Sequence, residues 1–315
     1  MSNIISEGDR NMEESYVFYN GKIVDEREVS ISIRSKLVNY GLGCFEGIRA
    51  YWDEESQQLY GFRLKEHYER LLQSCKALYI NIPYTVSELC DYTVELLKKN
   101  NFRTTVYIRP LAYKGGEGLS PTLLDEDNRL LIYCEPMGNF SGKTEARVSV
   151  TSWQRIRDNM LPPRTKATAA YLNSALASLE VLRNGYDEAI FLTDSGNVCE
   201  GPGENIFMMK KGKLITPPPS DNILEGITRE TIMTLAREEL GMEVVERSIS
   251  RTELYSAQEA FFSGTAMEVL SIVEVDRRTI GTGKQGEISK KLKELFFEIT
   301  AGRNPKYMDY CTPVY

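Results

Sequence analysis

Strand-like and helix-like runs alternate along the whole chain, on both sides of a short polar segment that begins at residue 137. Residues 64–78 carry apolar side chains at a helical period, whereas residues 104–113 form a continuous apolar run typical of a buried strand. The 315 residues exceed the size at which a single hydrophobic core stops growing. We therefore predict an α/β protein with a small domain (1–136), a linker (137–146) and a larger domain (147–315).

Composition excludes several classes of function. The formal net charge is −7, and nucleic-acid binding proteins instead carry clustered Lys and Arg. The six cysteines form no Cys-x-x-Cys pair, and His67 is the single histidine, so we expect neither a metal site nor a disulfide framework. No apolar run approaches the ~20 residues of a membrane span. We expect a cytoplasmic protein that binds neither membranes nor nucleic acid.

Lys166 lies between a strand-like run (147–153) and a helix-like run (172–183). The small residues around it leave room for a bulky group to approach the ammonium. Lysine forms Schiff bases with carbonyl compounds, and burial readily lowers its pKa. Taken alone, the segment fits a solvated loop lysine better, so the rest of the chain must decide.

Two further segments carry cations on or beside strands. Arg63 follows a strand-like run and either holds a phosphate or lies on the surface. Tyr107 and Arg109 share one face of a buried strand, because side chains two residues apart point the same way. A buried charge without a partner is costly, so we expect this face to line a cavity that holds an anion.

Three motifs in the second half offer the remaining polar groups. Glu200 begins a strand (198–207) interrupted by glycines, and is either an exposed acid or a carboxylate directed into a site. Thr228 lies in the first turn of a predicted helix, where free N–H groups could bind an anion. Residues 263–266 add N–H groups and the Thr265 hydroxyl. A lysine, phosphate donors and a carboxylate are together the parts that a pyridoxal phosphate enzyme requires.

Seven motifs occur in the order found in class IV (fold type IV) aminotransferases, and the chain most closely resembles the branched-chain amino acid aminotransferases among them. The resemblance covers residues 19–303 and implies a small α+β domain, a larger pseudo-barrel α/β domain, and a cofactor site between them. The motifs are Tyr40-Gly-x-x-x-Phe45-Glu-Gly-Ile-Arg49, Phe62-Arg63, Tyr107-Ile-Arg109-Pro-Leu, Lys166-x5-Leu172, Glu200-Gly-x-Gly-Glu-Asn-x-Phe207, Gly226-Ile-Thr-Arg229 and Ser263-Gly-Thr-Ala266.

The resemblance implies pyridoxal 5′-phosphate as the cofactor. Lys166 would hold it as a Schiff base and carry the proton between the substrate Cα and the cofactor. Glu200 would bind the ring nitrogen, and Tyr171 the 3-oxygen. The phosphate would be bound by Arg63, Gly226, Ile227, Thr228 and Thr265.

The implied reaction transfers the amino group of L-leucine, L-isoleucine or L-valine to 2-oxoglutarate. Tyr107, Thr265 and Ala266 would bind the α-carboxylate, and Arg109 the second carboxylate of glutamate. Tyr40 would come from the partner subunit of a homodimer. The other residues implied in the pocket are Phe45, Arg49, Met137 and Phe140. Met137 and Phe140 stand where related enzymes often carry Trp and Tyr, which we expect to broaden or shift the side-chain preference.

Two alternatives remain open at this stage. A D-amino acid aminotransferase or an aminodeoxychorismate lyase shares the lysine, the glutamate and the phosphate donors, but typically lacks the Tyr-x-Arg strand. A non-catalytic protein that inherited the fold would have no use for a buried amine and a buried acid together.

Overall fold

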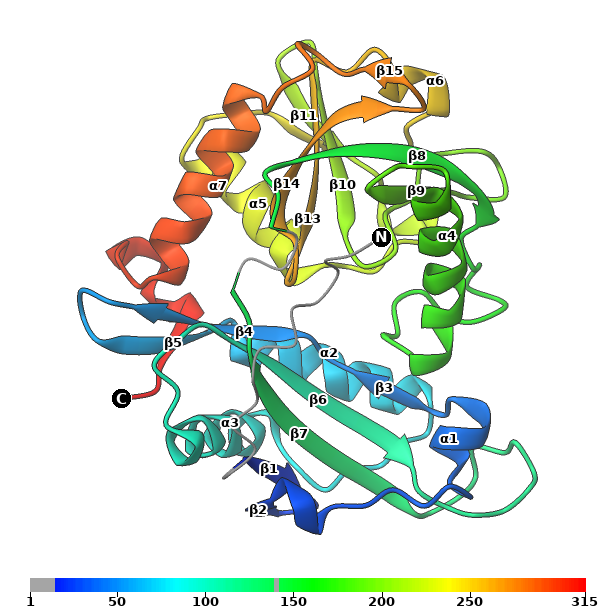
Figure 1. Cartoon of the computed structure of the whole chain (residues 1–315), viewed down its shortest axis with the longest axis vertical. Coiled ribbons are helices and arrows are strands. Elements are labelled where there is room, and N and C mark those ends of the chain that lie inside the picture. The colour runs from blue at the N-terminus through cyan, green and yellow to red at the C-terminus, as the bar shows by residue number, and fades with distance from the viewer. Residues whose placement is uncertain (1–14, 139–141) are drawn as a thin grey trace.

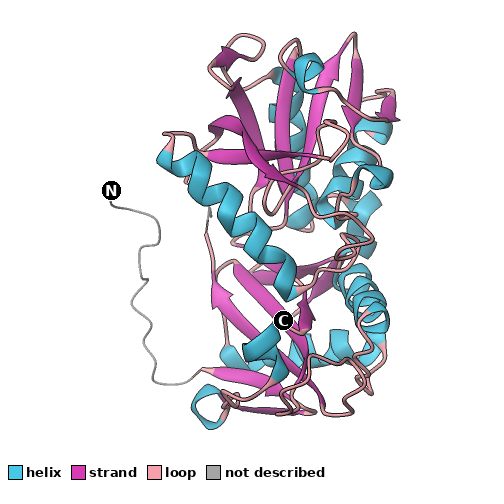
Figure 2. Cartoon of the chain, turned by 90° about the vertical axis from the view of Figure 1, so that its right-hand side faces the viewer, coloured by secondary structure: helices cyan, strands magenta, loops and turns pink. Residues whose placement is uncertain are grey.

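The computed structural model describes residues 15–138 and 142–315, and its strands form two eight-stranded sheets that lie in separate lobes (Figures 1 and 2). Figure 1 shows the first sheet in the lower lobe with α1, α2 and α3, and the second in the upper lobe with α4, α5, α6 and α7. The predicted α/β class is thereby confirmed. No described helix is both long enough and apolar enough to span a bilayer.

The first sheet is antiparallel, in the order β16-β5-β4-β6-β7-β1-β2, with β3 paired to β6. Its first two strands form a hairpin that turns at Asn20 and Gly21, a residue pair typical of a two-residue turn. The strands are β1 (Tyr16–Tyr19), β2 (Lys22–Asp25), β3 (Gly43–Phe45), β4 (Ile48–Asp53), β5 (Gln58–Phe62), β6 (Val106–Lys114), β7 (Asn128–Pro136) and β16 (Cys311–Pro313).

The division into domains at residues 137–146 stays a prediction, and the sheets follow it with one exception. Strand β16 comes from the C-terminal end of the chain but pairs with β5 in the first sheet. The predicted linker also overlaps the second sheet, because β8 begins at Glu145.

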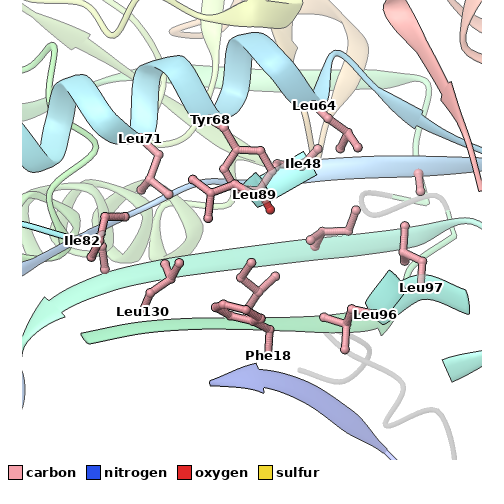
Figure 3. Close-up of a cluster of buried hydrophobic side chains, with 14 of the residues drawn as sticks. Phe18, Ile48, Leu64, Tyr68, Leu71, Ile82, Leu89, Leu96, Leu97 and Leu130 are labelled. Atoms are coloured by element: carbon pink, nitrogen blue, oxygen red, sulfur yellow. The ribbon is translucent and has the colours of Figure 1, made fainter. Parts of the chain in front are cut away.

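Two amphipathic helices, α2 (Leu64–Ala77) and α3 (Val86–Asn100), form the core of the lower lobe with the sheet (Figure 3). Leu64, Tyr68 and Leu71 are buried at the helical spacing predicted from the sequence. A capping box between Thr85 and Glu88 fixes the start of α3. The short α1 (Lys36–Tyr40) precedes β3.

The second sheet is mixed, in the order β12-β11-β10-β13-β14-β8-β9, with β15 paired to β14. Its strands are β8 (Glu145–Gln154), β9 (Glu188–Leu192), β10 (Asn205–Lys210), β11 (Lys213–Thr216), β12 (Val244–Glu246), β13 (Glu259–Gly264), β14 (Glu268–Val275) and β15 (Arg278–Thr279). Its helices are α4 (Tyr171–Arg183), α5 (Ile227–Glu238), α6 (Arg251–Leu254) and α7 (Glu287–Thr300). Short 3-10 turns occupy Glu26–Glu28, Thr168–Ala170, Pro219–Asp221 and Pro305–Tyr310.

The predicted strand at residues 198–207 is wrong in its first half, since β10 begins only at Asn205. Residues 200–204 form a loop instead, in which the Gly201 N–H donates to the carbonyl of Glu204 at 2.7 Å. This tight loop fixes the backbone position of Glu200.

Helix α7 carries an aromatic contact that joins the two lobes. Phe296 is 1% exposed and packs edge-on against Phe62 at 5.5 Å and Tyr51 at 6.2 Å between ring centroids. Both partners belong to strands of the lower lobe. One hydrophobic cluster therefore spans the lobes and limits how far they separate.

We predict that Phe296→Ala destabilises the protein by about 3–5 kcal/mol, because it opens a cavity in this shared cluster. The adjacent Phe297 is 38% exposed, so Phe297→Ala is the matched control and is expected to cost much less. Urea unfolding at one protein concentration measures both variants. Equal losses for the two would contradict the role assigned to Phe296.

Candidate active site

The Lys166 segment lies against the lower lobe through its backbone. The N–H of Phe45 in β3 donates to the carbonyl of Lys166 at 3.0 Å, and Cys44 forms an antiparallel bridge with Ala167. The N–H of Lys166 donates to Ser74 Oγ in α2 at 3.3 Å. The lysine therefore lies at the boundary between the lobes, with its main chain fixed by both β3 and α2.

The side chain of Lys166 points to two aromatic rings. Its Nζ donates to the Tyr171 hydroxyl oxygen at 2.7 Å and lies 5.2 Å from the centre of the Phe45 ring. The rings of Phe45 and Tyr171 are 4.8 Å apart. A small cavity beside Lys166 and Tyr171 is also lined by Arg155 and Leu224. The lysine is half-buried, which excludes the fully solvated loop lysine.

Glu200 is buried, so the exposed-acid alternative is wrong. Its Oε2 accepts hydrogen bonds from Asn205 Nδ2 and the Leu224 N–H, both at 3.0 Å. Its Oε1 lies 2.8 Å from Arg155 Nη2 but accepts no hydrogen bond of good geometry among the described residues. Burial raises the pKa of Glu200, and the charge of Arg155 opposes that shift. One carboxylate oxygen thus remains available to a donor.

The first turn of α5 offers free N–H groups. Gly226 precedes the helix without a side-chain cap, and Ile227 and Thr228 are buried. A side chain at position 226 would collide with Asn205 Oδ1, at 2.1 Å from the added Cβ, so glycine is required here. Uncapped first-turn N–H groups and a threonine hydroxyl suit an anion.

Arg63 lies against the same turn and is buried, which excludes the surface alternative. Its Nη1 donates to the carbonyl of Ile227 at 3.3 Å, and its remaining contacts include Glu66 and Glu230. The guanidinium carbon of Arg63 lies 4.5 Å from the centre of the Tyr310 ring. Thr265 and Ala266 form the turn between β13 and β14 and are half-buried.

Tyr107 and Arg109 share one face of β6 as predicted, since Arg109 Nη2 donates to the Tyr107 hydroxyl at 2.8 Å. The Arg109 guanidinium lies over the Phe45 ring at 4.3 Å, and its buried Nε has no hydrogen-bond partner among the described residues. Gly47 leaves space for the phenol, because a Cβ there would fall 2.3 Å from the Tyr107 hydroxyl. A cation, a phenol and an aromatic ring therefore share one surface.

Arg49 is buried, and its guanidinium is occupied by contacts within the protein. Its Nη1 pairs with Glu268 at 2.6 Å, and its Nη2 donates to the carbonyls of Met137 at 2.8 Å and of Gly138. These contacts fix the start of the predicted linker, so a direct role for Arg49 in substrate binding stays a prediction. Phe140, also predicted for the pocket, lies outside the described residues.

Tyr40 is the last residue of α1. Its side chain is partly exposed, and its hydroxyl donates to the carbonyl of Leu119. This placement is compatible with the predicted contribution of Tyr40 to a neighbouring subunit, which stays a prediction.

Sequence reasoning missed a buried charge network behind Phe45. Both oxygens of Glu46 pair with Arg70, at 2.7 and 2.8 Å, and Oε2 also lies 2.7 Å from His67 Nδ1. Burial raises the pKa of the Glu46 carboxyl, but Arg70 and His67 outweigh this effect and hold the pKa below its usual value. Arg70 Nη1 donates to the carbonyl of Glu225, immediately before α5. The network connects β3 with the anion-binding turn.

Asn205 and Arg155 were also missed. Asn205 belongs to the motif that begins at Glu200, so its amide was within reach of sequence reasoning. Arg155 follows β8 without any motif to mark it, and its contact with Glu200 arises only from the parallel pairing of β8 with β9.

The unpaired polar atoms of this site fit a pyridoxal phosphate. Glu200 Oε1 can accept from a pyridinium N–H, and the first turn of α5 can bind a phosphate dianion. The Lys166 Nζ and the Tyr171 hydroxyl are 2.7 Å apart, and both residues line the same small cavity as Arg155 and Leu224.

Comparison with known proteins identifies the family. The model of the family described as "Amino-transferase class IV" matches residues 43–275. A probable branched-chain-amino-acid aminotransferase of Aquifex aeolicus (strain VF5) is 48% identical over 301 residues, 95% of this chain and 97% of the relative.

Solved structures of the same kind superimpose closely. The branched-chain aminotransferase of Thermoproteus uzoniensis with norvaline has a TM-score of 0.92 and 44% identity, covering 96% of this chain and 100% of that one. The branched-chain amino acid aminotransferase of Thermobaculum terrenum in its PLP-form has a TM-score of 0.91 and 39% identity, covering 96% of this chain and 99% of that one. The chain therefore belongs to the class IV aminotransferases, enzymes that depend on pyridoxal 5′-phosphate.

Proposed function

We propose that this enzyme transfers the amino group of L-leucine, L-isoleucine or L-valine to 2-oxoglutarate, giving the branched 2-oxoacid and L-glutamate. The observation that carries this proposal is Arg109, a cation with an unpaired buried Nε that lies directly on the Phe45 ring. An aliphatic side chain can pack on the ring, and the second carboxylate of glutamate can bind the guanidinium. The relatives named as branched-chain enzymes support it.

In this proposal each residue has one task. Bound pyridoxal phosphate supplies the electron sink for the pair freed at the substrate Cα. Glu200 Oε1 accepts the ring N–H, while Asn205 and Leu224 hold the other oxygen. Lys166 Nζ would take the proton from the substrate Cα as a general base and deliver it to the C4′ carbon of the cofactor as a general acid. Tyr171 orients that amine through the 2.7 Å contact.

The remaining residues bind the two ends of the ligands. The first turn of α5, with Gly226, Ile227 and Thr228, holds the phosphate together with Arg63 and Thr265. Tyr107 and the turn at Thr265 and Ala266 bind the α-carboxylate. The free thiols of all six cysteines suit a reducing cytoplasm, which we propose as the compartment.

Absorption spectroscopy tests the proposal directly. The enzyme saturated with pyridoxal phosphate is expected to show a visible band that L-leucine abolishes and 2-oxoglutarate restores. Lys166→Ala is expected to lack that band. A band that responds to D-alanine but not to L-leucine would instead indicate a D-amino acid aminotransferase. A folded wild-type protein without any band would contradict the role of Lys166.

We predict that Arg109→Met weakens the reaction with 2-oxoglutarate by ~10–100-fold in kcat/KM, the size expected for losing a charge-assisted hydrogen bond. The reaction with L-leucine should change much less, because its side chain carries no charge. Half-reaction kinetics with each substrate measure the two effects separately. Arg109→Lys, which keeps the charge, is the control, and an equal loss for both substrates would contradict the assignment.

We further propose that the enzyme is a homodimer in which Tyr40 of one subunit completes the pocket of the other. Large apolar side chains are exposed on α1, on α4, on the segments that precede these helices and on the loop between β6 and β7. Figure 1 shows both helices on the same side of the molecule. A monomer rarely exposes so much apolar surface in one region. The side chains are Ile33, Val38, Tyr40, Leu119, Leu124, Met160, Leu172, Leu179 and Leu182.

Leu119 is 89% exposed, and Leu119→Asp is therefore expected to shift the protein toward monomer and to lower its activity. Light scattering after size-exclusion chromatography, over a range of concentrations, measures the shift. Phe297→Asp on α7, at the opposite side in Figure 1, is the control. A wild-type protein that is monomeric and fully active would refute the shared pocket.

A further inference from the structure

Arg155 is a largely buried cation that has no task in the proposed reaction. It follows β8 directly, and its N–H donates to the carbonyl of Leu192 at 3.0 Å, which fixes its backbone beside β9. Its side chain is 10% exposed, and its Nη2 lies 2.8 Å from Glu200 Oε1. The guanidinium carbon lies 5.4 Å from the centre of the Phe191 ring. Arg155 also lines the cavity beside Lys166.

This guanidinium is only partly satisfied. Its Nε and Nη1 are buried and have no hydrogen-bond partner among the described residues. Leaving buried N–H groups unpaired costs free energy, and sites where this is tolerated are commonly functional. A role limited to packing would be filled at lower cost by an apolar side chain of the same shape.

Glu200 receives its counter-charge from Arg155. The two donors on Oε2, from Asn205 and Leu224, are neutral amides. The charged and titratable groups around the carboxylate are Arg155 after β8, Lys166 before α4, and Cys199 and Glu204 of its own loop. Burial raises the pKa of Glu200, and Arg155 is the largest opposing influence.

The opposing effects of burial and of Arg155 decide where the proton between Glu200 and the bound cofactor lies. A buried acid and a pyridine can exist as an ion pair or as a neutral pair, and burial favours the neutral one. A second cation next to the carboxylate favours the ion pair, because it stabilises the anion. Arginine is charged at every relevant pH, so its charge acts on Glu200 throughout that range.

We propose that Arg155 is a positioning residue that keeps Glu200 ionised and thereby holds the shared proton on the ring nitrogen of bound pyridoxal phosphate. This inference rests on the proposed function. Arg155 acts through Glu200 without touching the reacting atoms. Without Arg155, the proton moves to the carboxyl oxygen, and the ring loses much of its capacity to accept electrons.

NMR of the enzyme loaded with pyridoxal phosphate labelled with ¹⁵N in the ring tests this. The wild type and Arg155→Lys are expected to show a protonated ring nitrogen at neutral pH, and Arg155→Met an unprotonated one. Arg157→Met is the matched control, because Arg157 lies two residues away in an exposed ion pair with Asp194. A protonated ring nitrogen in Arg155→Met would overturn the proposal.

The pH dependence of stability is a second test, and it needs no bound cofactor. It therefore remains usable if Arg155→Met does not bind pyridoxal phosphate. In that variant Glu200 is an uncompensated buried acid whose pKa rises further above its unfolded value. Its stability relative to the wild type is then expected to fall as the pH rises through the folded-state pKa of Glu200 in the wild type, which burial already raises above the usual glutamate value, because the variant ionises this acid only at a still higher pH. The double variant Arg155→Met with Glu200→Gln lacks the acid and should lose this dependence. Identical pH profiles for the single and double variants would overturn the proposal.

The outcomes separate this inference from the proposed function. A wild-type protein that neither binds pyridoxal phosphate nor responds to L-leucine refutes the proposed function. A wild-type protein that does both, with an unaltered ring nitrogen in Arg155→Met, refutes the role of Arg155 alone.

Discussion

The site depends on one short backbone contact between the lobes, in which Phe45 donates to Lys166 and Cys44 pairs with Ala167. Few residues are involved, yet they place the lysine against the ring of Phe45 and beside Tyr171. Because the main chain is held on both sides, Nζ starts from a defined position. The cluster around Phe296 then limits separation of the lobes and protects this contact from opening.

Charge compensation is the second constraint, because the boundary between the lobes buries many ionised groups. Glu46 is neutralised by Arg70, and Arg49 by Glu268, within the protein itself. Such pairs contribute little net stability, but removing one partner leaves a costly buried charge. They therefore fix geometry: one connects β3 with the start of α5, and the other holds the beginning of the predicted linker.

Sequence alone predicted the α/β class, the amphipathic helices and the face shared by Tyr107 and Arg109, because these follow from local periodicity. It also singled out Lys166 and Glu200, whose segments carry motifs and whose roles stay predictions. It did not predict β16, whose place depends on pairing across the whole chain, nor the loop at residues 200–204, where glycines suggested a broken strand. Arg155 escaped for the same reason: its partner lies far along the chain, and only the packing of β8 beside β9 brings them together.

The arginines near the lobe boundary differ in how completely their guanidinium N–H groups are hydrogen-bonded. Arg63 divides its contacts among carboxylates, a carbonyl and the Thr231 hydroxyl. Arg49, Arg109 and Arg155 each keep at least one buried N–H group without a partner among the described residues. Arg49 is paired with Glu268, whereas Arg109 lies over the Phe45 ring and Arg155 lies beside Glu200. An unpaired buried N–H is tolerated where a ligand or a neighbouring charge later repays its desolvation. In the proposed roles, Arg109 would bind a carboxylate of the substrate, whereas Arg155 is already paired with Glu200 and would act on the group that Glu200 binds.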